Sequence, residues 1–143
     1  MNDNQNEFWQ HHSLKFLEMA FRADRRERLQ QADGHGKNTG ECGDTVEIFL
    51  MLDGNRIKSV SYDVNGCIYT NACANTVIEL AQGKDLEQAW EIQPGDVADF
   101  LETLPEDHFH CAELAAGALY AALAKAREIQ RSPWKKLYDT AQG

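Results

Sequence analysis

Positive charge is scarce in this sequence. Lysine and arginine together number 14, against 23 aspartate and glutamate residues, which gives a formal net charge of −9 at pH 7. Binding to nucleic acid depends on clustered Lys and Arg side chains that neutralise phosphates, so we expect no nucleic-acid partner. An acidic protein is better suited to contact basic patches on other proteins.

Long apolar runs are also missing. No stretch approaches the roughly 20 residues needed to span a bilayer. The polar start, Met1 to Asn6, lacks the basic-then-apolar pattern of a signal peptide. We therefore expect no membrane contact and a cytoplasmic location. The four cysteines should then stay reduced and serve metal binding or thiol chemistry, not disulfides.

Internal repeats, low-complexity segments and linkers are absent as well, and 143 residues suit one domain with one core. We expect a single domain over residues 1–143. It would consist of an N-terminal helix over 7–31, a glycine-rich mobile loop over 32–44, a sheet over 45–69 and a helical part over 70–143.

The fold class follows from a change of pattern along the chain. "TVEIFLML" (45–52) alternates apolar and polar residues, "DGN" (53–55) is a hairpin signal, and "RIKSVSYDV" (56–64) alternates again. Helical spacing follows, with Asp96 as an expected N-cap and a long alanine-rich helix near the C-terminus. The sequence predicts an α+β fold: a small antiparallel sheet of about three strands, with helices packed on one face.

Three cysteines fall at expected junctions between elements. Cys42 precedes the first strand, Cys67 lies between the second strand and a helix, and Cys111 lies in the first turn of the alanine-rich helix. A helix N-terminus stabilises a thiolate, which is the form that binds metals. No short CxxC pair is present, so an ordinary zinc knuckle is not expected. The spacing alone allows a three-thiolate site with Asp44 or His110 nearby.

The remaining cysteine and the other histidines fit this site less well. Cys73 lies inside a helix between two alanines, and we interpret it as a small buried hydrophobic residue. His108 is a secondary candidate for the site. His35 falls in the predicted mobile loop and is expected to be exposed.

Three short motifs resemble the ligand segments of the NifU/IscU-type iron–sulfur cluster assembly scaffolds. These are "GECGD" (40–44), "NGC" (65–67) and "HCAELAAGALYAAL" (110–123), and their order agrees with the family. The resemblance implies the NifU/IscU-like fold. It also implies a metal site formed by Cys42, Cys67 and Cys111, with Asp44 and His110 as further ligands.

The resemblance further implies a scaffold, not an enzyme. Members of the family build a cluster, usually [2Fe–2S], from iron and from sulfur that a cysteine desulfurase delivers, and pass it to recipient apo-proteins. The bound cluster is therefore transient. Thiolates suit cluster iron, whereas a carboxylate or imidazole ligand suits it less well and favours release. An iron donor and a homodimer remain open, and zinc can occupy the same ligands in purified protein.

One departure from the family concerns a partner. Many members carry Leu-Pro-Pro-Val-Lys, which is read by a dedicated Hsp70-type chaperone, where this chain has "LPEDH" (104–108). That difference argues against the standard chaperone. Two other functions stay open: a sulfurtransferase that carries a persulfide on Cys111 or Cys67, and a zinc protein that uses the same ligands.

Overall fold

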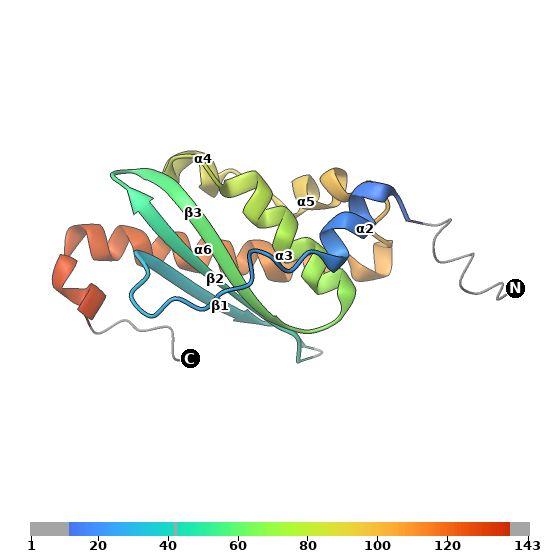
Figure 1. Cartoon of the computed structure of the whole chain (residues 1–143), viewed down its shortest axis with the longest axis horizontal. Coiled ribbons are helices and arrows are strands. Elements are labelled where there is room, and N and C mark those ends of the chain that lie inside the picture. Colours follow the sequence, from blue (N-terminus) through green and yellow to red (C-terminus); the bar gives the residue numbers. More distant parts are fainter. Residues whose placement is uncertain (1–11, 42, 138–143) are drawn as a thin grey trace, which may run out of the picture.

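The computed structural model describes residues 12–41 and 43–137, and its core is a three-stranded sheet covered by helices. The strands are antiparallel in the order β1-β2-β3, as the α+β prediction requires (Figure 1). The elements are α2 (Leu14–Phe21), β1 (Gly34–Thr39), β2 (Thr45–Asp53), β3 (Arg56–Asn65), α3 (Ile68–Ala81), α4 (Leu86–Trp90), α5 (Pro94–Leu101), α6 (Phe109–Arg131) and the 3₁₀ turns η1 (Glu106–His108) and η2 (Pro133–Leu137).

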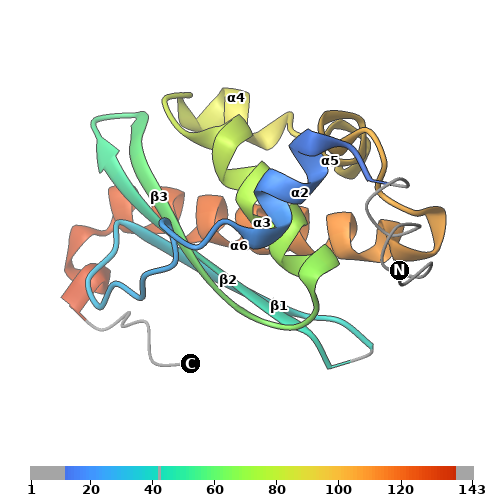
Figure 2. The same ribbon diagram turned by 45° about the vertical axis from the view of Figure 1, so that its right-hand side comes forward.

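Helices α3 and α6 cover one face of the sheet. Helix α6 packs on β1 and β2, α3 packs on β3, and α2 lies on the outside of α3 (Figure 2). Val46, Ile48 and Leu50 of β2 are fully buried in the core shared with these helices. The alternation in the sequence therefore predicted correctly which side chains enter the core.

Residues 22–33 run first beside β3, where Arg26 forms an isolated parallel bridge with Tyr62, and then across the opposite face of the sheet, in front of the strands in Figure 1. The aromatic ring of Phe49 forms a small second cluster with Ala32, Leu29 and Met51 on this side. Polar side chains of the crossing segment also bind the sheet, since Arg28 forms ion pairs with Glu47 and Asp63. Both faces of the sheet are therefore covered, although by different kinds of structure.

The predicted N-terminal helix over 7–31 is wrong in its second half. Among the described residues the helix is α2, which ends at Phe21, and residues 7–11 lie outside the described part. The side-chain amides of Asn75 and Asn71 in α3 donate 2.8 Å hydrogen bonds to the carbonyls of Met19 and Ala20. These bonds satisfy carbonyls that a longer helix would use for its next turn.

The predicted mobile loop over 32–44 is also wrong, because residues 34–39 form strand β1 at the edge of the sheet. A Cβ atom on Gly36 would lie 2.3 Å from the Ala122 nitrogen and 2.4 Å from the Ala118 oxygen of α6. The glycines of β1 thus allow the backbone of this strand to touch the backbone of α6, a contact that no residue with a side chain permits.

Smaller differences concern element ends in the second half of the chain. The predicted sheet over 45–69 ends at Asn65, and helix α3 already begins at Ile68. Helix α5 begins one turn earlier than expected: Gln93 is its N-cap, and Asp96 is the third helical residue, whose side chain accepts from the Gln93 amide. In the described ranges, 12–41 and 43–137, we find no helix with the length and apolar character that crossing a membrane requires.

Candidate functional site

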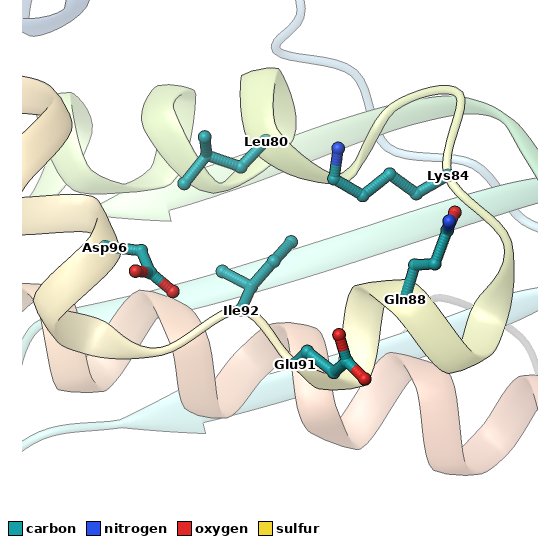
Figure 3. Close-up of a pocket in the computed structure, with 6 residues that line it drawn as sticks. All are labelled: Leu80, Lys84, Gln88, Glu91, Ile92 and Asp96. Carbon is teal, nitrogen blue, oxygen red and sulfur yellow. The ribbon is translucent and has the colours of Figure 1, made fainter.

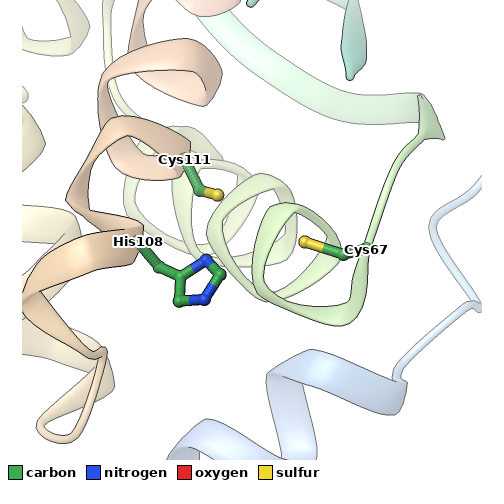
Figure 4. A group of neighbouring side chains, drawn as sticks. All are labelled: Cys67, His108 and Cys111. Atoms are coloured by element: carbon green, nitrogen blue, oxygen red, sulfur yellow. The ribbon is translucent and has the colours of Figure 1, made fainter. Parts of the chain in front are cut away.

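Two cysteines meet where the N-terminal ends of α3 and α6 converge. Cys67 is the N-cap residue of α3, and Cys111 is the third residue of α6. One ligand atom each from Cys67, Cys111 and His108 lies within 4.8 Å of the others. Figure 4 shows the two sulfur atoms facing each other, with the imidazole ring beside them.

The two thiols differ in their access to solvent. Cys67 is exposed, whereas the side chain of Cys111 is buried with 1% of its surface accessible. Burial raises the pKa of the Cys111 thiol to about 11, against a smaller lowering by its hydrogen bond from Thr70. Desolvation therefore works against the thiolate that the helix N-terminus is expected to stabilise at Cys111 in the metal-free protein.

Thr70 lies at the centre of this site, and sequence reasoning missed it. Its hydroxyl donates a 2.8 Å hydrogen bond to the carboxylate of Asp44 and lies 3.5 Å from the sulfur of Cys67 and 3.4 Å from that of Cys111. The signal was available, because a residue three positions after a helix N-cap turns its side chain back toward the cap.

Asp44 reaches the same site from the segment before β2. Its carboxylate packs against the backbone of Gly66, where a Cβ atom would lie 2.7 Å from the carboxylate oxygen. The glycine of the "NGC" motif is therefore needed for this close approach. Gly43 has a φ of +92°, which other residues adopt only with strain, at the point where the chain turns into β2.

The two histidines near Cys111 occupy different environments. His110 is exposed, and its Nε2 atom lies 3.6 Å from the Cys111 sulfur. His108 is partly buried and stacks on the ring of Tyr69, with 3.8 Å between ring centroids and 16° between planes. The buried Nδ1 atom of His108 has no hydrogen-bond partner among the described residues. His108 is thus the imidazole in the three-residue group, while the sequence predicts His110.

Other predicted residues lie in or out of this group as follows. Cys42 falls outside the described residues, so its role as a ligand stays a prediction. Cys73 is fully buried in the main core, and burial raises its pKa well above the ordinary value, as expected for an inert core thiol. The prediction that His35 is exposed is wrong. Its side chain is partly buried, lies 2.9 Å from the Glu47 carboxylate and stacks on Phe49.

A pocket elsewhere on the molecule does not involve the thiols. It lies where α4, α5 and the end of α3 meet, and Figure 3 shows its lining. Leu80 and Ile92 provide its apolar part, and the other lining residues are Lys84, Gln88, Glu91 and Asp96. None of these is a cysteine or histidine, so the candidate metal chemistry belongs to the helix ends and not to this pocket.

The protein is a small α+β domain in which Cys67 and Cys111 lie at the converging N-terminal ends of two helices. The family model for the NifU-like N terminal domain matches residues 23–132 of the chain. The chain belongs to this NifU-like N-terminal domain family. Both predictions made from the three motifs, the family and its α+β fold, are thereby confirmed.

Curated relatives carry names that agree with one another. The chain is 35% identical over 97 residues to iron–sulfur cluster assembly scaffold protein IscU 1 of Archaeoglobus fulgidus, and the match spans 67% of this chain and 63% of that protein. It is 32% identical over 100 residues to the IscU scaffold protein of Escherichia coli, over 64% of this chain and 77% of that protein. The chain thus spans less than two thirds of the archaeal relative's length.

Solved structures support the fold alone, because their sequence identity is low. A protein of Fervidobacterium islandicum, described as a cluster assembly scaffold for the SUF system, superposes with a TM-score of 0.66 at 19% identity, over 80% of this chain and 97% of that one. The N-terminal part of a NifU-like protein from Brucella abortus gives a TM-score of 0.60 at 16% identity, over 84% and 94% of the two chains.

Proposed function

We propose that this protein is a scaffold on which an iron–sulfur cluster is assembled and from which it is passed to apo-proteins. The observation that carries the proposal is the group formed by Cys67, Cys111 and His108 at two converging helix ends in a NifU-like fold. The proposal is also supported by relatives that are named cluster assembly scaffolds. Iron and sulfide are the substrates, and a [2Fe–2S] cluster is the product that leaves.

The proposed ligands differ in how strongly they hold the cluster. The thiolates of Cys42, Cys67 and Cys111 would bind iron, and Asp44 or an imidazole would take the remaining position. Thiolates are the usual ligands of cluster iron, whereas carboxylate oxygen and imidazole nitrogen are harder donors that suit it less well. One weak ligand suits a protein that must give up its cluster.

The exposure of Cys67 fits the delivery of sulfur. A cysteine desulfurase presents sulfur on its own cysteine, so the receiving thiol must be reachable from outside. Cys67 is exposed, while Cys111 is buried behind it with a raised pKa. We therefore propose that incoming sulfur meets Cys67 first. The same asymmetry disfavours a sulfurtransferase that uses Cys111 as its nucleophile, because a protonated, buried thiol attacks slowly.

The experiment is anaerobic reconstitution of the purified protein with ferrous iron, cysteine and a cysteine desulfurase. A scaffold develops the visible absorbance of a cluster and contains iron and acid-labile sulfide in similar amounts. The Cys67→Ala variant should form none. Cys73→Ala is the matched control, since Cys73 is a core thiol, and should form as much cluster as the parent protein.

A zinc protein is the second candidate, and the donor set itself favours it. Two thiols and an imidazole are common ligands of tetrahedral zinc. Zinc retained through reconstitution, with no visible absorbance and no sulfide, would replace the scaffold proposal with this one. Extra sulfur on Cys67 by mass spectrometry, without iron, would instead support a persulfide carrier.

A further inference from the structure

His108 occupies a position that the family resemblance does not assign to the metal site. It is the last residue of η1 and the N-cap residue of α6, three positions before Cys111. It belongs to the "LPEDH" segment in which this chain departs from its family. The structure nevertheless brings one of its ring nitrogens within 4.8 Å of both cysteine sulfurs.

We propose that His108 is the imidazole ligand of the metal, together with Cys67 and Cys111, and that His110 is not. This inference deepens the proposed function, because it names a ligand of the same site, and it applies equally to a bound Zn²⁺ or Fe²⁺ ion. A ligating imidazole must be neutral and must offer one nitrogen lone pair to the metal.

The spacing of the three donor atoms fits a single ion. With metal–ligand bonds of about 2.0–2.3 Å, the donor atoms of a tetrahedral zinc site lie roughly 3–4 Å apart. Donor atoms that already lie within 4.8 Å of one another reach that spacing by small side-chain rotations. His110 is near only one of the two sulfurs in the described structure, at 3.6 Å from Cys111.

The environment of His108 holds its ring in place before any metal arrives. The ring lies parallel to that of Tyr69, the second residue of α3, so its plane is fixed relative to Cys67 at the start of the same helix. Tyr69 in turn contacts the ring of Phe16 in α2, with centroids 5.7 Å apart. A preorganised ligand loses less conformational entropy on binding than the exposed side chain of His110 does.

The buried Nδ1 atom of His108 gives an independent reason. It has no hydrogen-bond partner among residues 12–41 and 43–137, and a buried polar atom without a partner is costly. In a metal site each ring nitrogen is satisfied, one by the metal and the other by a hydrogen bond or water. Coordination of the metal through Nδ1 would therefore remove a cost that the metal-free protein carries.

The test is a titration with Co²⁺ and then Zn²⁺, followed by visible absorption. His108→Phe keeps an aromatic ring on Tyr69 and removes both nitrogens, and His110→Phe is the matched control two residues away. We expect His108→Phe to weaken Co²⁺ binding by at least about 10-fold, since even the loss of a partner outside the ligand shell costs about 10–100-fold. It should also shift the Co²⁺ ligand-field bands. His110→Phe should change the Co²⁺ affinity by less than about 3-fold and leave the bands in place.

Two further measurements keep the result interpretable. In the unmodified protein, ¹⁵N NMR should show a large Zn²⁺-induced shift at a ring nitrogen of His108 and a smaller one at His110, with no risk of misfolding. His108→Cys should recover Co²⁺ affinity, because a thiolate can replace the imidazole. The reverse order in the NMR experiment, or in the two Phe variants, would overturn the inference.

The outcome also separates this inference from the proposed function. A parent protein that assembles a cluster, and does so equally well as His108→Phe with unchanged Co²⁺ binding, would leave the scaffold standing and refute the role of His108. A parent protein that binds Zn²⁺ through His108 but never assembles a cluster would refute the scaffold and leave the ligand assignment intact.

Discussion

The hydroxyl of Thr70 donates a 2.8 Å hydrogen bond to the carboxylate of Asp44 and so ties the segment before β2 to the first turn of α3. Thr70 is fully buried. The same hydroxyl lies 3.4 Å from the sulfur of Cys111, to which it can also donate, and 3.5 Å from that of Cys67. Because a hydroxyl carries one proton, it donates to one of these partners at a time. The carboxylate and the thiols are thus joined through one side chain before any metal is bound.

Replacing Thr70 tests that connection. Thr70→Val keeps the shape and removes the hydroxyl, and we expect it to lower the free energy of unfolding by about 1–3 kcal/mol, since the Asp44 carboxylate loses a partner. Urea denaturation measures the change. Thr76→Val is the control in the same helix: its hydroxyl bonds the carbonyl of Ala72, which keeps its helical bond, so the loss should be smaller. Equal losses would contradict the special role of Thr70.

The Asp44 carboxylate should affect release of the cluster more than its formation. Asp44→Ala removes a charge and an oxygen donor but leaves the thiolates, so the variant should bind a cluster. We expect it to transfer the cluster to apo-ferredoxin several-fold more slowly, because the proposed exchangeable ligand is gone. Circular dichroism of the recipient follows the transfer. Transfer at the parent rate would reduce Asp44 to a residue that only shapes the turn.

Because β1 packs closely on α6, we expect a substitution at Gly36 to lower the stability of the fold strongly. Gly36→Ala would put a methyl group 2.3 Å from the Ala122 nitrogen, and overpacking of this kind costs about 1–3 kcal/mol or more. Gly95→Ala is the matched control, because a Cβ atom there meets nothing within 4 Å and the backbone is helical. That change should be neutral or stabilise by about 0.4–1 kcal/mol. Thermal unfolding of both variants gives the comparison.

The raised pKa of Cys111 predicts how stability depends on pH. In the unfolded chain the pKa of this thiol lies near its ordinary value of about 9, and in the folded protein it lies at about 11. Between these values the folded state holds a proton that the unfolded state has lost, so stability falls as pH rises from about 9 to 11.

Comparison with Cys111→Ala isolates this contribution from those of other groups that titrate at high pH. We expect the parent protein to lose about 2 kcal/mol more stability than the variant across that range, because each pKa unit corresponds to about 1.36 kcal/mol. Urea denaturation of the metal-free proteins at several pH values measures it. Parallel curves for the two proteins would show that Cys111 has an ordinary pKa.

The parts of the fold that the sequence predicts well are those with a regular apolar pattern. Strands β2 and β3 were evident from alternation, because their buried side chains are the large apolar ones. Strand β1 was not, since "GHGKNT" contains no apolar side chain at all. It is a strand because its glycines let α6 approach, and this depends on a helix more than 70 residues away in the sequence.

The same distinction applies to the site. Cys67 and Cys111 were predictable as neighbours, because both stand at the start of a helix and both lie in motifs that resemble the ligand segments of one family. The choice between His108 and His110 was not, because two residues apart on a chain entering a helix point in different directions. The 3₁₀ turn η1 and the stacking on Tyr69 hold the ring of His108, one nitrogen of which lies within 4.8 Å of both sulfurs, and neither feature can be read from spacing.

The glycine contact between β1 and α6 also has a mechanical consequence. Asn38 adds a 3.2 Å hydrogen bond from its amide to the carbonyl of Leu114, one helical turn after Cys111. These contacts fix the position of β1 along the first half of α6. We therefore expect any opening of the site to involve the start of α3, where Cys67 is exposed, more than the contact between β1 and α6.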